Sequence, residues 1–201
     1  MNGVDKVEIT KGVVVYRNVF DPGTIIEEIE KESAKDWPYL SWSPSSTGTG
    51  TIGDYRTSYQ LELGILMNPD IIEGHRLHNV SKQWLNAFSQ IDACVHDYRS
   101  EYSLRLNTDE GYRVLKYSNG AEYLEHVDWH EDNNRQLSLV GWFNDDFDGG
   151  GLYFKNFDTT VQPEKGSIVL FPSNYLFSHA ALPVGEINKK DIKYSFVTWF
   201  R

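Results

Sequence analysis

The chain lacks the features that mark several protein classes. Cys94 is its single cysteine among 201 residues, which excludes an internal disulfide and a cysteine-rich zinc site. No apolar run approaches the roughly 18 residues needed to span a bilayer, and the first ten residues, MNGVDKVEIT, hold no apolar signal-peptide core. We therefore expect a cytoplasmic protein without a membrane partner.

Basic residues are fewer than acidic ones: the chain has 19 Lys and Arg, 29 Asp and Glu, and a net charge of −10. Because nucleic-acid affinity comes largely from phosphate neutralisation by Lys and Arg, we expect no nucleic-acid partner. Aromatic residues make up 14% of the chain, which favours β-structure. The length predicts a single domain spanning residues 1–201, since domains average roughly 150 residues.

Up to about residue 105 the sequence predicts a support region containing two helices. Apolar residues spaced three or four apart indicate a long second helix, and Asp21-Pro22 is typical of an N-cap and first helical residue. The predicted elements are a strand at Val13–Tyr16, a helix from Asp21 to about Lys35, a mobile loop at Ser43–Gly53, a strand at Arg56–Leu63 and a helix from about Pro69 to Tyr102.

From about residue 106 to 201 the pattern changes to short strands separated by turns. Many short strands at near-regular spacing indicate a sandwich, jelly roll or barrel. The predicted strands are Gly111–Tyr117, Glu122–Val127, Gln136–Phe143, Leu152–Lys155, Ser167–Phe171, Phe177–Leu182 and Ile192–Phe200.

His126-Val127-Asp128 is the triplet that suggests chemistry. Residues i and i+2 of a strand point to the same face, so the imidazole and the carboxylate converge. Two histidines and one carboxylate on one face of an iron ion are the signature of non-haem Fe(II) oxygenases. The triplet alone proves little, since about 0.45 His-x-Asp triplets are expected by chance at this composition.

A second histidine from a distant strand is needed, and His179, directly after a predicted strand, is the candidate. His130 continues the face of the triplet, but three ligands from one short strand would crowd a metal, so we expect it at the periphery or surface. His96 falls on the long predicted helix. His75 and His78 are spaced to chelate a metal there, although a solvated helix face explains them as well.

These residues, in this order, resemble the 2-oxoglutarate- and Fe(II)-dependent dioxygenases, and within them the prolyl 4-hydroxylase group. Four segments carry the resemblance besides the weaker Arg56-Thr57-Ser58. They are Tyr117-Ser-Asn-Gly-Ala-Glu-Tyr123-Leu-Glu-His126-Val-Asp128, Gly149-Gly150-Gly151-Leu152-Tyr153-Phe154, His179-Ala-Ala-Leu-Pro183-Val184 and Lys193-Tyr-Ser-Phe-Val-Thr-Trp199-Phe.

The resemblance implies a double-stranded β-helix, a mainly β jelly roll buttressed by N-terminal helices. It also implies site residues. His126, Asp128 and His179 would bind Fe(II). Lys193 and Tyr117 would hold the far carboxylate of 2-oxoglutarate, and Trp199 would line the same pocket. Arg56, Tyr123 and Trp142 are the candidate substrate residues.

The cation that receives 2-oxoglutarate departs from the family spacing. A basic residue usually follows the distal histidine by nine or ten positions, which favours Lys189. The strand context favours Lys193, because the side chain must project from a strand into the barrel, and we choose Lys193.

The implied reaction hydroxylates a C–H bond with Fe(II), 2-oxoglutarate and O2, releases succinate and CO2, and uses ascorbate as reductant. The resemblance makes a proline-containing peptide or protein the leading substrate, with Trp42 or Trp142 packing on the proline ring. Two alternatives stay open: hydroxylation of a free amino acid or small metabolite, and a jelly-roll binding module that keeps a metal without turnover.

Overall fold

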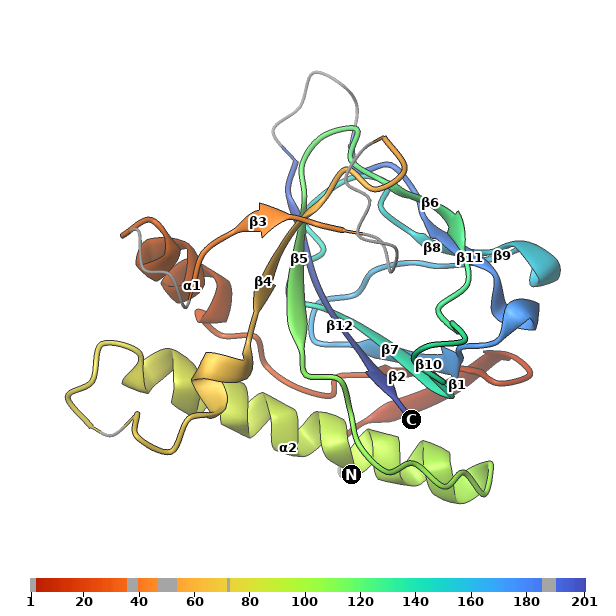
Figure 1. The fold of residues 1–201 in the computed structure, drawn as a ribbon, viewed down its shortest axis with the longest axis horizontal. Helices are drawn as coiled ribbons and strands as arrows, with labels where there is room; N and C mark the ends of the chain where they lie inside the picture. The colour runs from red at the N-terminus through yellow and green to blue at the C-terminus, as the bar shows by residue number, and fades with distance from the viewer. Residues whose placement is uncertain (1–2, 36–39, 47–53, 72, 186–190) are drawn as a thin grey trace.

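The computed structural model describes residues 3–35, 40–46, 54–71, 73–185 and 191–201. Within these residues the strands form two antiparallel sheets, with a long helix along one side of the molecule (Figure 1). The larger sheet has the order β1-β2-β10-β7-β12-β5-β4-β3. Its strands are β1 (Asp5–Thr10), β2 (Val13–Arg17), β3 (Ser43–Pro44), β4 (Tyr59–Glu62), β5 (Arg113–Tyr117), β7 (Leu137–Trp142), β10 (Ile168–Pro172) and β12 (Lys193–Phe200).

The smaller sheet has the order β6-β11-β8-β9 and faces the C-terminal strands of the larger one. It is built from β6 (Tyr123–His126), β8 (Leu152–Phe154), β9 (Thr159–Val161) and β11 (His179–Ala181). Two facing antiparallel sheets with helices outside confirm the predicted jelly roll. All seven strands predicted after residue 106 are present, while β1, β3 and β9 were missed. Ser43 and Pro44, predicted as the start of a loop, pair with β4 instead.

The helices are α1 (Ile25–Ser33) and α2 (His78–Glu101), with short 3₁₀ turns η1 (Gly64–Met67), η2 (Lys155–Phe157) and η3 (Tyr175–Phe177). The predicted start of each α-helix was wrong. Asp21 accepts a hydrogen bond from the Gly23 amide and forms a turn before α1. The long helix begins at His78 rather than near Pro69, after Gly74 adopts φ +90°, a conformation that breaks a helix.

The N-terminal region contributes more than helical support. It supplies four strands of the larger sheet, β1 to β4, so both halves of the chain build that sheet. Among the described residues, no helix is long and apolar enough to cross a membrane.

Strand β12 shows how the layers divide its side chains. Phe196 packs outward with the α2 residue Trp84, ring centroids 5.7 Å apart. The alternate residues Lys193, Ser195 and Val197 line an internal cavity. This period of two follows from the pleat of a strand and places one face of β12 toward the smaller sheet.

Candidate functional site

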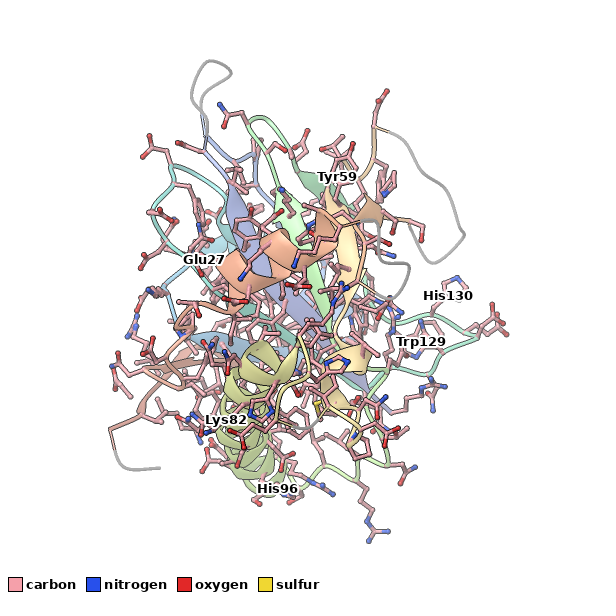
Figure 2. All side chains as sticks on the ribbon, turned by 90° about the vertical axis from the view of Figure 1, so that its left-hand side faces the viewer. Glu27, Tyr59, Lys82, His96, Trp129 and His130 are labelled. Carbon is pink, nitrogen blue, oxygen red and sulfur yellow. The ribbon has the colours of Figure 1, made fainter. Side chains whose placement is uncertain are left out.

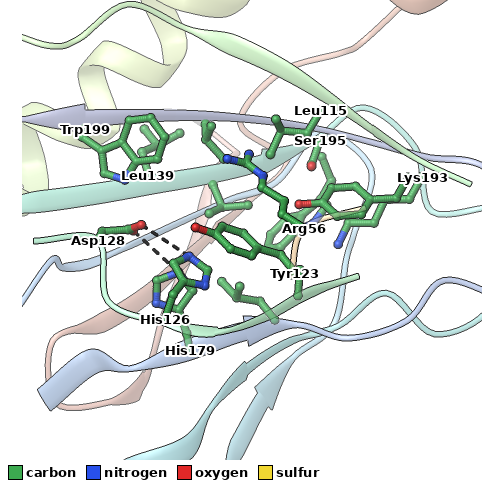
Figure 3. Close-up of a pocket in the computed structure, with 16 residues that line it drawn as sticks. Arg56, Leu115, Tyr123, His126, Asp128, Leu139, His179, Lys193, Ser195 and Trp199 are labelled. Atoms are coloured by element: carbon green, nitrogen blue, oxygen red, sulfur yellow. Dashed lines mark ion pairs between the residues drawn. The ribbon is translucent and has the colours of Figure 1, made fainter. Parts of the chain in front are cut away.

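Three potential metal ligands meet at the edge of the smaller sheet. His126 ends β6 and His179 begins β11, and the two residues are direct cross-strand partners. Asp128 lies in a bend two residues after His126, not within the strand as predicted. Its carboxylate still turns to the same side, so the predicted convergence holds (Figure 3).

The ligand atoms of these residues lie within 4.8 Å of one another. The Asp128 Oδ1 atom is 3.5 Å from His126 Nε2, and Oδ2 is 3.6 Å from His179 Nε2. Each imidazole is oriented by its other nitrogen: Nδ1 of His126 lies 2.9 Å from the Leu124 carbonyl oxygen and Nδ1 of His179 lies 2.9 Å from that of Phe177. When Nδ1–H donates to a carbonyl, Nε2 keeps its lone pair for a metal.

The electrostatics suit a divalent cation. Burial by itself raises the pKa of Asp128, but the His179 and His126 rings and the Ser138 hydroxyl outweigh it and hold that pKa below its ordinary value. Burial and the neighbouring His126 lower the pKa of His179 to about 4. At neutral pH the cluster therefore presents an ionised carboxylate beside a neutral His179 imidazole, the forms that ligate metals.

Buried polar groups hold Asp128 in place. The Ser138 hydroxyl on β7 donates to Asp128 Oδ2 over 2.7 Å and is itself 2.8 Å from the Ser173 hydroxyl. Arg135 donates to the Asp128 carbonyl oxygen over 3.4 Å and makes a two-point ion pair with Glu110. These contacts fix which side of the bend the carboxylate occupies.

A cavity extends from the three ligands between the sheets. Lys193 lies at its other end, as Figure 3 shows. Lys193 is 2% exposed, and its ammonium donates to the Gly150 carbonyl oxygen. Among the described residues no carboxylate pairs with it, and burial lowers its pKa to about 7. A buried ammonium without a counter-ion fits an anion-binding role.

The other predicted site residues also line this cavity. Tyr117 pairs with Lys193 across β5 and β12, and its ring centre is 5.0 Å from the ammonium. Arg56 stacks on Tyr123 at 4.6 Å. The cavity is further lined by Trp142, fully buried, and by Trp199, 7% exposed.

Other histidines lie away from the three ligands. His130 is exposed and 3.5 Å from Asp132, in agreement with a surface position, and Figure 2 shows it pointing outward with Trp129. His96 is exposed on α2, paired with Asp92. Neither His75 nor His78 belongs to a three-ligand cluster within the part of the chain that the structure describes.

The predictions for Trp42 as a substrate residue and for Lys189 as the alternative cation have different outcomes. Trp42 does not line the cavity and packs against Tyr194, ring centroids 6.3 Å apart. Lys189 and most of the Ser43–Gly53 segment lie outside the described residues, so the alternative to Lys193 stays open.

Sequence reasoning missed three polar residues around the site. Ser195 follows Lys193 on the cavity face of β12, and strand alternation could have found it. Ser138 interrupts an otherwise apolar strand, a weak signal. Nothing in the sequence marked Arg135, whose guanidinium lies 3.7 Å from the Trp199 ring centre.

Comparison with known proteins agrees with this geometry. Residues 112–201 match the family model described as the 2OG-Fe(II) oxygenase superfamily. This stretch of the chain is similar to that superfamily. The match contains the three ligands and Lys193, so the resemblance noted from the sequence is confirmed. No curated protein matches the sequence.

Solved oxygenase structures share the fold across nearly the whole chain. A Trichoplax adhaerens prolyl hydroxylase, solved with a hypoxia inducible factor peptide fragment, aligns with a TM-score of 0.69 and 15% identity, over 95% of this chain and 84% of its own. A Pseudomonas putida prolyl-4-hydroxylase gives 0.67 and 21% over 94% and 92%. The viral collagen prolyl hydroxylase of Paramecium Bursaria Chlorella virus-1 gives 0.62 and 17% over 94% and 96%. At these identities the likeness establishes the fold.

The residues present fit the iron and the 2-oxoglutarate of this superfamily. Two oriented imidazoles and a carboxylate form the facial donor set of non-haem Fe(II) sites. The uncompensated ammonium of Lys193 suits a dicarboxylate that reaches across the cavity from the metal. The chain thus has a place for both groups.

Proposed function

We propose that this protein is an Fe(II)- and 2-oxoglutarate-dependent dioxygenase that hydroxylates a C–H bond and releases succinate and CO2. The observation that carries the proposal is the pairing of two features in one cavity. His126, Asp128 and His179 form a cluster of potential metal ligands at one end, and Lys193 at the other is a buried cation that no carboxylate of the described residues neutralises.

The chain's residues would bind and orient the reactants. His126, Asp128 and His179 would hold the iron on one side only, which leaves the cavity side for other ligands. Lys193 and Tyr117 would receive the far carboxylate of 2-oxoglutarate, with the Ser195 hydroxyl on the same strand face. When bound, iron and 2-oxoglutarate supply the oxidation by O2, and the protein supplies alignment and exclusion of water. Ascorbate would serve as the reductant that keeps the iron ferrous.

A proline-containing peptide or protein is the substrate we infer. Its support is the family motifs in this sequence and the fold shared with three prolyl hydroxylases. A second hollow, lined by Arg56, Tyr123, His130, Arg135 and Trp199 among others, adjoins the metal cluster on its outer side and would admit an extended chain.

Binding of the cosubstrate tests the proposal before any substrate is known. Under anaerobic conditions, Fe(II) and 2-oxoglutarate should give a weak visible charge-transfer band in the wild type. His179→Ala should abolish the band because it removes one ligand, whereas His130→Ala should retain it because that imidazole is exposed. Absence of the band in wild-type protein that has bound iron would overturn the dioxygenase proposal.

Turnover then separates the enzyme from a binding module. Proline-containing peptides and free amino acids should be screened for stimulated succinate formation under O2. Stimulation by peptides supports the prolyl assignment, and stimulation by free amino acids alone supports the small-metabolite alternative. A protein that forms the band but releases no succinate with or without these compounds would be a binding module.

A further inference from the structure

The guanidinium of Arg56 has a feature that the proposed reaction does not use. The residue is 7% exposed, yet its Nε atom has no hydrogen-bond partner. One amino group donates to the Ser46 carbonyl oxygen over 2.9 Å, the guanidinium also contacts the Tyr117 hydroxyl, and its plane stacks on Tyr123. No carboxylate among the described residues pairs with it. A buried, unpaired cation costs folding free energy, so its presence calls for a ligand.

Neighbouring arginines differ in this respect. Arg113 and Arg135 also face the outer hollow, but each has a carboxylate of its own. The Arg113 guanidinium pairs with Glu62 at 2.6 Å, and that of Arg135 pairs with Glu110 at 2.6 Å. At the outer hollow, Arg56 is therefore the arginine whose charge no carboxylate of the described residues neutralises. The net charge of the whole chain is −10.

With iron and 2-oxoglutarate bound, one positive charge in the site would still lack a counter-ion. The charged side chains that line the inner cavity, apart from its histidines, are Arg56, Asp128 and Lys193. When bound, iron(II) would be balanced by Asp128 and one carboxylate of 2-oxoglutarate, and Lys193 would balance the other carboxylate. The charge of Arg56 remains.

The position of Arg56 identifies which reactant that anion belongs to. Arg56 lines both the inner cavity and the outer hollow, and Figure 3 shows it between the metal cluster and Lys193, beside Tyr123. A group held on the outer-hollow side of Arg56 would lie at the entrance, next to the metal cluster.

We propose that Arg56 binds a carboxylate of the substrate, so that the enzyme selects an anionic substrate over its neutral analogue. This inference rests on the proposed function and names its substrate class. Two sources share this chemistry: the free α-carboxylate of an amino acid or chain terminus, and an acidic side chain beside the target residue of a peptide.

Two matched pairs of probes separate these sources. N-acetyl-L-proline and N-acetyl-L-prolinamide differ in the α-carboxylate, while N-acetyl-Pro-Glu-amide and N-acetyl-Pro-Gln-amide differ in a neighbouring side chain. Each is titrated by anaerobic calorimetry into protein loaded with Fe(II) and 2-oxoglutarate. We expect the anionic member of at least one pair to bind roughly tenfold tighter or more, since the pairing is buried.

Variants assign the preference to Arg56. Arg56→Met should abolish it, Arg56→Lys should keep part of it, and Arg113→Met should leave it intact, because Glu62 already neutralises Arg113. The melting temperature provides a second readout: Arg56→Met should not lower it, because an unpaired cation is removed. Arg135→Met should lower it, because the largely buried Glu110 loses its two-point partner and keeps, among the described residues, only Arg201, 3.5 Å away.

Three results would overturn the proposal: no preference in either pair for the wild type, a preference that survives in Arg56→Met, or loss of 2-oxoglutarate binding in that variant, which would assign Arg56 to the cosubstrate. If wild-type protein binds neither iron nor 2-oxoglutarate, the proposed function fails. The probes are then titrated into metal-free Lys193→Met protein, where Arg56 is the remaining cavity cation, and the same preference, or its absence, decides the case.

Discussion

The pKa values of individual side chains at this site depend on their surroundings and not on residue type alone. Lys193 begins a strand at a place where lysine is ordinarily solvated, yet here it is buried between Tyr117 and Gly150. Burial lowers its pKa to about 7. Because that pKa lies below the ordinary lysine value of 10.5, the unfolded chain holds the proton more tightly. The cosubstrate-free fold therefore gains stability from this group as pH rises from about 7 towards 10.5.

The same shift predicts a pH dependence for 2-oxoglutarate binding. A carboxylate favours the charged ammonium, so binding above pH 7 should take up a proton at Lys193. We expect the affinity to be level just below pH 7 and to fall by up to about tenfold per unit above it. Calorimetry in two buffers of different ionisation enthalpy measures the proton uptake.

Lys193→Arg is the control for this expectation, since an arginine stays charged throughout this range. The variant should bind 2-oxoglutarate without the proton uptake. An affinity that is flat to pH 9 in the wild type would mean that another group receives the carboxylate.

Among the secondary-structure elements, the turn before β8 determines the space available to the Lys193 side chain. The Gly149–Gly150 turn precedes β8, and Gly150 has φ +66°. A Cβ atom there would lie 3.0 Å from Lys193 Cδ and 2.9 Å from the Phe147 ring. The turn therefore needs glycine both for its backbone conformation and for the space that Lys193 occupies.

Gly150→Ala should therefore weaken 2-oxoglutarate binding as well as stability. We expect a loss of about 1–2 kcal/mol in the free energy of unfolding and a several-fold loss of cosubstrate affinity, because the ammonium is displaced. Gly120→Ala is the matched control: its φ is +73°, and nothing lies within 4 Å of the added Cβ. It should lower stability by a similar amount, as urea denaturation would show, with unchanged cosubstrate affinity. Equal affinities in the two variants would contradict the role of the turn.

For the molecule as a whole, the proposed ligands would join the two sheets. Two of the metal residues belong to β6 and β11 of the smaller sheet and the third lies in the bend after β6, while Lys193 lies on β12 of the larger sheet. A metal ion alone would tie together β6, β11 and the bend that holds Asp128. The cosubstrate, held at the metal and at Lys193, would link both sheets.

Hydrogen exchange should resolve these two steps. Fe(II) alone, added anaerobically, should increase protection in β6 and β11. Addition of 2-oxoglutarate should extend the protection to β5 and β12, with a stabilisation of about 2.7 kcal/mol at a hundredfold excess over Kd. Lys193→Met should keep the first effect and lose most of the second. Protection of β12 by metal alone would contradict the prediction that 2-oxoglutarate is needed to stabilise this strand.

Local sequence patterns determined most of the strands of this protein and the candidate residues of its site. Alternation in β12, the spacing of His126 and Asp128, and the turn signals after residue 106 predicted the jelly-roll strands and the three potential metal ligands. These features depend on the two-residue period of a strand and on glycine turns, which neighbouring residues specify. The helix starts were wrong because the Gly23 and Gly74 turns were not recognised in the apolar pattern.

Only the tertiary structure decided which polar groups are paired. Arg113, Arg135 and Arg56 look alike in the sequence, yet Glu62 and Glu110, each from a distant segment, neutralise the first two and none of the described residues neutralises the third. The burial of Lys193 and the Ser138 contact to Asp128 likewise depend on strands far apart in the chain. Charge compensation and burial are properties of residues brought together by folding, and no local pattern encodes them.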